Sequence, residues 1–147
     1  MSVTTITTEE VYLKQGRAAT WAISVKDSGG TPYDFSVGYT GHMQVRERAN
    51  SRNFLDKLTT TNSRITFDDG ADADGINCRL IWSDEDSDVI LATDRRREKR
   101  VTLLGDLEIT ETSTGNVVAS VAMSIIFEQS VTHSSGTLEG VGYWTVT

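Results

Sequence analysis

The chain has 147 residues, a net charge of −7, one cysteine and a hydrophobic fraction of 37%. This length fits a single domain with a core, and the acidic balance argues against a general nucleic-acid binder. No window approaches the roughly 20 apolar residues needed to span a bilayer, and a lone cysteine excludes an intrachain disulfide. The opening residues, MSVTTITTEE, lack the basic region and apolar core of a signal peptide, so we expect no secretory signal.

Alternating apolar and polar residues begin near the N-terminus. Residues 2–13 suggest an extended leader. In residues 19–26, the side chains of Trp21, Ile23 and Val25 fall on one face, which predicts a strand with one buried side.

A second run, residues 39–46, places Met43 and Val45 on one face and polar residues on the other. Between the two runs, residues 27–32 are rich in Gly, Ser, Asp and Pro, the residues that form turns. Together the runs predict a half-buried β-hairpin.

The middle of the chain predicts shorter elements. Residues 54–58 and 65–67 suggest short strands, and the alternation of Cys78, Leu80 and Trp82 indicates a better one. The only good helix candidate is 83–92, where Ser83 can cap the N-terminus and acidic residues follow it.

The longest strand patterns come late. One face of 101–109 carries Leu107 and Ile109, and one face of 117–131 carries Val121, Met123 and Ile125, with a turn at 112–116 between them. These elements predict an all-β protein: an antiparallel β-sandwich, immunoglobulin-like or related, with one short helix. A closed barrel is the competing architecture. We expect a sandwich domain over residues 1–132 and a flexible C-terminal arm over 133–147.

Catalytic and metal-binding motifs are weak. The acidic loop 68–75 partly resembles a calcium loop, but Gly70 occupies the first ligand position and Ile81 the closing one, so a solvated loop is favoured. His42 and His133 have no partners at metal-ligand spacing, and no nucleophile motif is present. We therefore expect no enzyme activity, metal or cofactor, and we expect Cys78 to be a buried small hydrophobic residue.

Two segments are candidate protein-interaction sites. The basic run Arg95, Arg96, Arg97, Lys99 and Arg100 either binds an acidic protein surface or neutralises the acidic residues that precede it. The tail carries Val141, Tyr143, Trp144 and Val146. This tail either folds back on its own sandwich or adds a strand to a neighbouring subunit.

Several segments, in order, resemble a known family. These are residues 21–27 (WAISVKD), 31–34 (TPYD), 43–46 (MQVR), 105–110 (GDLEIT) and 122–132. The pattern resembles the small β-sandwich domains of tailed bacteriophages, including the N-terminal domains of baseplate upper proteins, and spans about residues 11–132. It departs from the family at residues 35–38 (FSVG), which are one residue longer than the usual Leu-Thr-Gly. The basic run before the late strand, residues 95–100, also carries more charge than the family pattern.

The resemblance implies a structural protein of the virion, assembled in the cytoplasm of the bacterial host. Its place would be the tail, baseplate or neck, where it would connect components or anchor a fibre or receptor-binding element. The implied partners are other virion proteins and further copies of the chain. The net charge and the lack of a long apolar run already predict that nucleic acid and a membrane are not partners. The alternatives are a capsid decoration or cement protein and a carbohydrate-binding module with Trp82, Trp144 or Tyr143 as its sugar platform.

Overall fold

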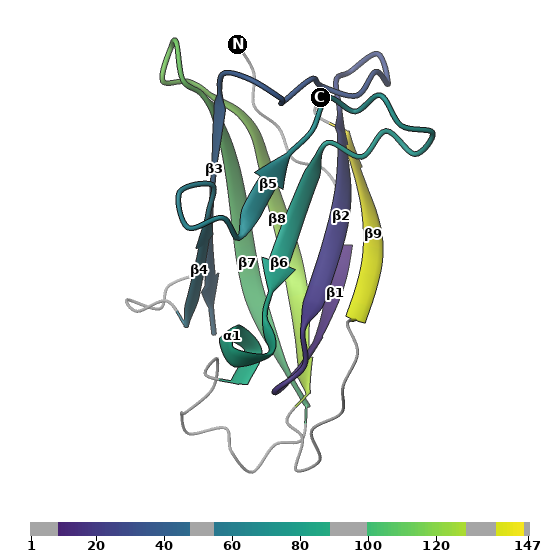
Figure 1. The fold of residues 1–147 in the computed structure, drawn as a ribbon. Helices are drawn as coiled ribbons and strands as arrows, with labels where there is room; N and C mark the ends of the chain where they lie inside the picture. Colours follow the sequence, from purple (N-terminus) through teal and green to yellow (C-terminus); the bar gives the residue numbers. More distant parts are fainter. Residues whose placement is uncertain (1–8, 48–54, 89–99, 129–137, 146–147) are drawn as a thin grey trace.

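The computed structural model describes residues 9–47, 55–88, 100–128 and 138–145. These residues form strands in two sheets and one short helix, so the all-β fold class is confirmed. The strands are β1 (Glu9–Lys14), β2 (Ala19–Lys26), β3 (Tyr39–Arg46), β4 (Asp56–Thr59), β5 (Ile65–Phe67), β6 (Cys78–Trp82), β7 (Arg100–Glu111), β8 (Val117–Glu128) and β9 (Leu138–Thr145). The helix α1 (Asp84–Asp88) lies between β6 and β7 (Figure 1).

The two sheets lie face to face and enclose the core (Figure 1). The five-stranded sheet has the order β1-β8-β7-β3-β4, and the four-stranded sheet has the order β5-β6-β2-β9. Two pairings are parallel, β1 with β8 and β2 with β9, so the expected antiparallel arrangement holds only for the others. Both exceptions follow from chain crossings, because β1 and β9 each lie in the opposite sheet from the strand next to them in sequence.

The predicted hairpin is wrong, because β2 and β3 belong to different sheets. The turn itself forms: the Asp27 carboxylate accepts hydrogen bonds from the backbone N–H groups of Gly29 (2.9 Å) and Thr31 (3.0 Å). Beyond the turn the chain makes one isolated antiparallel bridge to β2, between Pro32 and Lys26, and then crosses to the other sheet. Alternation identifies which face of a strand is buried, but not which strand it pairs with.

The core lies between the sheets. Trp21 is only partly buried and packs against the edge of this core. The other predicted core residues are at most 1% exposed, namely Ile23, Val25, Met43, Val45, Cys78, Leu80, Leu107, Ile109, Val121, Met123 and Ile125.

The C-terminal segment differs from the expected flexible arm. Residues Leu138–Thr145 form β9, which pairs in register with all of β2 from Ala19 to Lys26. The sandwich therefore extends beyond residue 132 to include this strand, while residues 129–137 and 146–147 lie outside the described part.

The helix begins as the sequence predicts. The Ser83 hydroxyl accepts a hydrogen bond from the Asp86 N–H at 3.0 Å, and the Asp86 carboxylate accepts one from the Ser83 N–H at 2.9 Å. This reciprocal cap satisfies two N–H groups that a helix terminus otherwise leaves unpaired. The second half of the predicted helix, residues 89–92, lies outside the described residues.

An ion-pair cluster ties the two sheets together near α1. The Arg64 guanidinium, just before β5, donates to both carboxylate oxygens of Asp56 on β4, at 2.8 and 2.7 Å. The indole N–H of Trp82 on β6 donates to the same carboxylate at 2.9 Å. Because β4 lies in one sheet and β5 and β6 in the other, this cluster bridges the layers.

Candidate functional site

The outer face of the five-stranded sheet is formed by alternate residues of its strands. On β3 the inward positions Met43 and Val45 are buried, so His42, Gln44 and Arg46 point outward. The same period of two turns other side chains outward on the neighbouring strands. These are Leu104, Asp106 and Glu108 on β7 and Ser120, Ala122 and Ser124 on β8.

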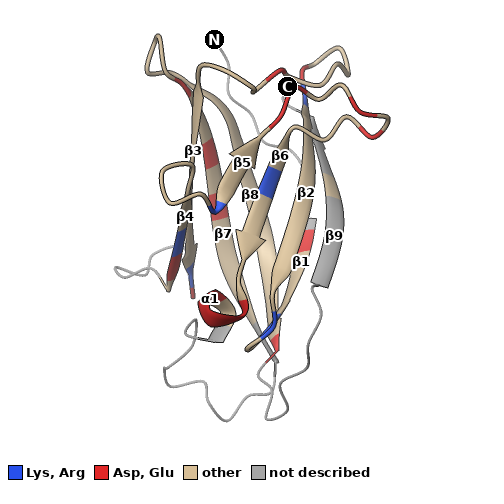
Figure 2. Ribbon diagram, viewed as in Figure 1, with Lys and Arg blue, Asp and Glu red and all other residues tan. Residues whose placement is uncertain are grey.

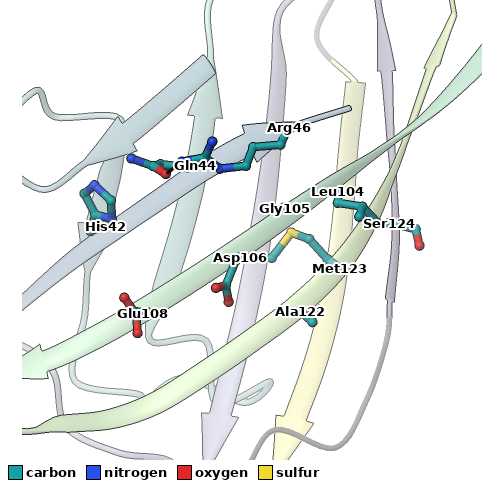
Figure 3. A pocket seen from close by; sticks show the side chains of 10 residues that line it. All are labelled: His42, Gln44, Arg46, Leu104, Gly105, Asp106, Glu108, Ala122, Met123 and Ser124. Carbon is teal, nitrogen blue, oxygen red and sulfur yellow. Dashed lines mark hydrogen bonds between the residues drawn. The ribbon is translucent and has the colours of Figure 1, made fainter. Parts of the chain in front are cut away.

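The register of β3 with β7 sets two rows of side chains against each other. His42 lies opposite Glu108, and Gln44 lies opposite Asp106. Figure 3 shows the two carboxylates along β7 and the imidazole and amide along β3. A row of imidazole and amide groups therefore runs beside a row of acidic side chains.

A groove of about 480 Å³ lies on this face (Figure 3). It forms partly because the outward side chains of β8 are small. Gly105 lies opposite Val45, in the inward-facing row of β7. A Cβ at Gly105 would lie 2.7 Å from the Met43 Cε, so the core leaves no room for a larger residue there. The groove is lined by His42, Gln44, Arg46, Leu104, Gly105, Asp106, Glu108, Ala122, Met123 and Ser124.

The outer face combines polar contacts with exposed apolar surface. The Arg46 guanidinium donates to the Gln44 amide oxygen, and the Ser120 hydroxyl donates to the Asp106 carboxylate at 3.5 Å. Leu104 is 39% exposed and Tyr12, on the neighbouring edge strand β1, is 48% exposed. A mixture of apolar and charged groups occurs both in protein interfaces and on the rest of a protein surface.

The Ser124 hydroxyl of the groove is far from the His42 imidazole. Thr59 of β4 lies directly opposite His42, and its hydroxyl accepts from the Asn62 N–H at 2.9 Å. Ser124 lies on β8, two strands away from His42 on β3, or about 10 Å across the sheet. It is also in the row of Arg46, four residues from His42, or about 13 Å along the strand. The Ser124 hydroxyl is therefore beyond hydrogen-bond reach of His42. Within the described residues no hydrogen bond joins His42 to Glu108.

The predicted basic site is described only at its last residue. Arg100 is the first residue of β7 and lies in register with Glu128 of β8. The others, Arg95, Arg96, Arg97 and Lys99, lie outside the described residues.

The predicted tail site is incorporated into the fold. Val141, Tyr143 and Trp144 lie in β9, in register with Ala22, Ser24 and Val25 of β2 in the same chain. Of the two expected outcomes, folding back on the chain's own sandwich is the one observed. Val146 lies outside the described residues.

Trp82 cannot act as a sugar platform. Its side chain is 1% exposed, and its indole N–H is bonded to Asp56. The prediction of an exposed stacking surface is therefore wrong at this position.

The acidic loop uses its carboxylates on its own backbone. Asp69 accepts from the N–H of Ala71 at 3.0 Å, and Asp72 accepts from the N–H groups of Asp74 and Ile76 at 3.1 and 2.9 Å. Acidic residues lie on these loops and on α1 (Figure 2). Among the residues that the structure describes, no group of three or more His, Cys, Asp or Glu side chains could hold a metal ion.

The groove is the feature that the motifs did not indicate. Its residues are the polar positions of predicted strands, so alternation alone could have placed them on outward faces. The pairing of β3 with β7, which are more than fifty residues apart, has no local signal. The described part of the chain contains no helix that is long and apolar enough to cross a membrane.

No protein-family model and no curated protein sequence matches the chain. Function is therefore inferred from the fold, its surfaces and the resemblance of its strand segments.

Proposed function

We propose that this protein is a structural, non-enzymatic component of a tailed-bacteriophage virion. It acts in the tail, baseplate or neck, where it connects components or anchors a fibre or receptor-binding element. The observation that carries this proposal is the outer face of the five-stranded sheet, which offers a broad, mixed polar and apolar groove on a two-sheet body. Its partners are other virion proteins and further copies of the chain.

The strand segments that resemble phage proteins support this proposal by their position. Segment 43–46 ends β3, segment 105–110 lies in β7, and 122–128 lies in β8. These strands are adjacent in the order β8-β7-β3 and contribute all of the groove-lining residues. Three of the five segments therefore lie in the strands that form the candidate surface, while 21–27 and 31–34 lie in β2 and the connection that follows it.

The proposal includes an immunoglobulin-like topology. In immunoglobulin domains, strands B, E and D share one sheet, and G, F, C and C′ share the other. Strands β2 to β8, taken in order as B, C, C′, D, E, F and G, give D-E-B and G-F-C-C′, which matches the observed strand orders. The edge strand β9 then occupies the place beside B that strand A takes in an immunoglobulin domain.

The test is to purify phage particles on a density gradient from a lysate of the strain that encodes the chain. We expect mass spectrometry to find its peptides in the particle band, in several copies per particle. Detection of the chain only in the soluble fraction would contradict the proposal. Immunogold labelling of the same particles distinguishes the tail or baseplate from the capsid shell, where a decoration protein would lie.

A further inference from the structure

We infer that the outer face of the five-stranded sheet binds a second copy of this chain through a two-fold interface centred on the boundary between β3 and β7. This interface rests on the proposed assembly function and gives it a surface and a partner. The two strands pair from Tyr39 opposite Glu111 to Arg46 opposite Leu104. The pairing continues over the whole of β3 without a shift in register.

Charges of opposite sign lie on the two sides of this boundary. On the β7 side, Asp106 and Glu108 are exposed acidic residues. On the other side, Arg46 extends from β3, and Lys57 of β4 shares the row of Gln44. A surface with opposite charges on either side of a line is self-complementary under two-fold rotation about that line. Two copies can therefore place the acidic side of each over the side of the other that carries Arg46 and Lys57.

A two-fold axis along the strands makes specific pairs. It preserves the level of each residue along the strand and exchanges the two sides, so His42 faces Glu108 of the second copy. At the next level, Gln44 faces Asp106 of the second copy. Two sheets packed face to face with their strands nearly aligned form the usual geometry of sheet-on-sheet contacts.

The groove fits a side chain from the second copy. Lys57, Gln44, Asp106 and Ala122 lie at one level across four strands. The axis exchanges the positions of β4 and β8, so Lys57 of the second copy lies over Ala122. The small side chain of Ala122 leaves room there. The aliphatic stem of that Lys57 can enter the groove while its ammonium group reaches Asp106.

The net charge of the chain also favours this face for self-association. Two copies that each carry a charge of −7 repel one another over most of their surfaces. The central part of the outer face is an exception, because Asp106 and Glu108 are balanced by Arg46 and Lys57. Copies can approach here without accumulating charge of one sign.

Sedimentation equilibrium of charge-reversal variants tests this interface. Glu108→Lys places a positive charge opposite His42 and next to the basic side of the second copy, and we expect it to raise the dissociation constant at least about tenfold. The double variant His42→Asp with Glu108→Lys restores the opposite pair, and we expect it to return to within about threefold of the unmodified chain. Glu85→Lys, an equal change of charge at an exposed position on α1, serves as the control and leaves association unchanged.

Each outcome decides one point. Association that is insensitive to Glu108→Lys, or that the double variant does not restore, overturns this interface. A chain that stays monomeric at every concentration overturns it too, while its presence in the particle band would leave the proposed function standing. Urea midpoints check folding, and if Glu108→Lys fails to fold, His42→Asp alone must weaken association by opposing two acids.

Discussion

At the scale of single residues, the Asn77 side chain continues the contact between β6 and β2 by hydrogen bonds to the backbone. It is fully buried just before β6, beyond the last register pair of Ile23 with Cys78. Its amide oxygen accepts from the Val25 N–H at 2.9 Å, and its amide nitrogen donates to the carbonyls of Val25 and Tyr33 at 2.8 and 2.9 Å. One side chain thus bonds three backbone groups. The Val25 carbonyl also accepts from the Tyr33 N–H at 3.0 Å, so the Val25 N–H and the Tyr33 carbonyl are the two groups that depend on Asn77.

We predict that Asn77→Ala lowers the free energy of unfolding by about 3 kcal/mol, because it leaves these buried groups unpaired. Urea denaturation measures the change. Asn116→Ala, in the exposed turn between β7 and β8, is the control and should change stability by less than about 0.5 kcal/mol. Equal effects of the two substitutions would show that the Asn77 amide is not needed.

The second residue-scale prediction concerns pH. Burial raises the pKa of the Cys78 thiol from 9.0 to about 12. Between these values the unfolded chain releases the thiol proton and the folded chain keeps it, so stability falls as pH rises. We expect the free energy of unfolding to fall more steeply in the wild type than in Cys78→Ala from pH 9 to 11. The difference in slope should approach about 1.4 kcal/mol per pH unit, and parallel slopes would argue against a buried thiol.

At the scale of elements, the ion pair of Asp56 with Arg64 joins the two sheets and its side chains are only 10% and 16% exposed. Asp56→Ala removes the partner of the Trp82 N–H and the closer of the two carboxylates that pair with the Arg64 guanidinium. The Asp86 carboxylate remains, at 3.3 Å from the guanidinium. We predict a loss of about 2–4 kcal/mol in the free energy of unfolding, measured in urea.

The matched control is Asp68→Ala, which breaks the pair with Arg79. Those two side chains are 56% and 37% exposed, so the loss should be below about 1 kcal/mol. If both substitutions cost the same, the cluster near α1 does not hold the sheets together.

Strand β9 gives the second prediction at this scale. Removing residues 138–147 uncovers the main chain of β2, and we expect it to cost at least about 3 kcal/mol, because each lost backbone hydrogen bond contributes about 0.5–1.5 kcal/mol. Urea denaturation measures the loss, and removing only 146–147 is the control. A truncated chain of unchanged stability but lower native mass would instead show that the tail binds a neighbouring copy.

The elements also show how far the sequence could predict the fold. Period-two alternation located the buried faces of β2, β3, β6, β7 and β8, because each buried side chain occupies every second position. It did not predict that β2 and β3 lie in different sheets or that β9 pairs with β2. Such pairings depend on contacts between segments far apart in the chain, and glycines at 136, 140 and 142 make the pattern of the tail resemble a loop.

The candidate site shows the same limit. The outward positions of β3, β7 and β8 follow from alternation, and His42 is noticeable as one of only two histidines. Its position opposite Glu108 depends on the register of strands that are not neighbours in sequence. The groove itself depends on the small outward side chains of β8 lying beside the polar positions of β7 and β3, which only the folded sheet reveals.

At the scale of the whole molecule, the proposed role and the inferred interface require the chain to associate with itself. The two-sheet body provides a face where acidic and basic strips adjoin, on a chain that is otherwise acidic. Raising the salt concentration should weaken association through this face, because partly exposed charge pairs are screened. Sheet-face contacts of this kind suit a protein that is used in many copies.

The most direct test is the native molar mass of the purified full-length chain by light scattering, over a range of concentrations at low and high salt. We predict a mass of at least twice the 16.1 kDa of one chain. On dilution or in high salt the mass should fall toward that of the single chain. A mass of 16.1 kDa at every concentration and at both salt concentrations would contradict self-association through the outer face.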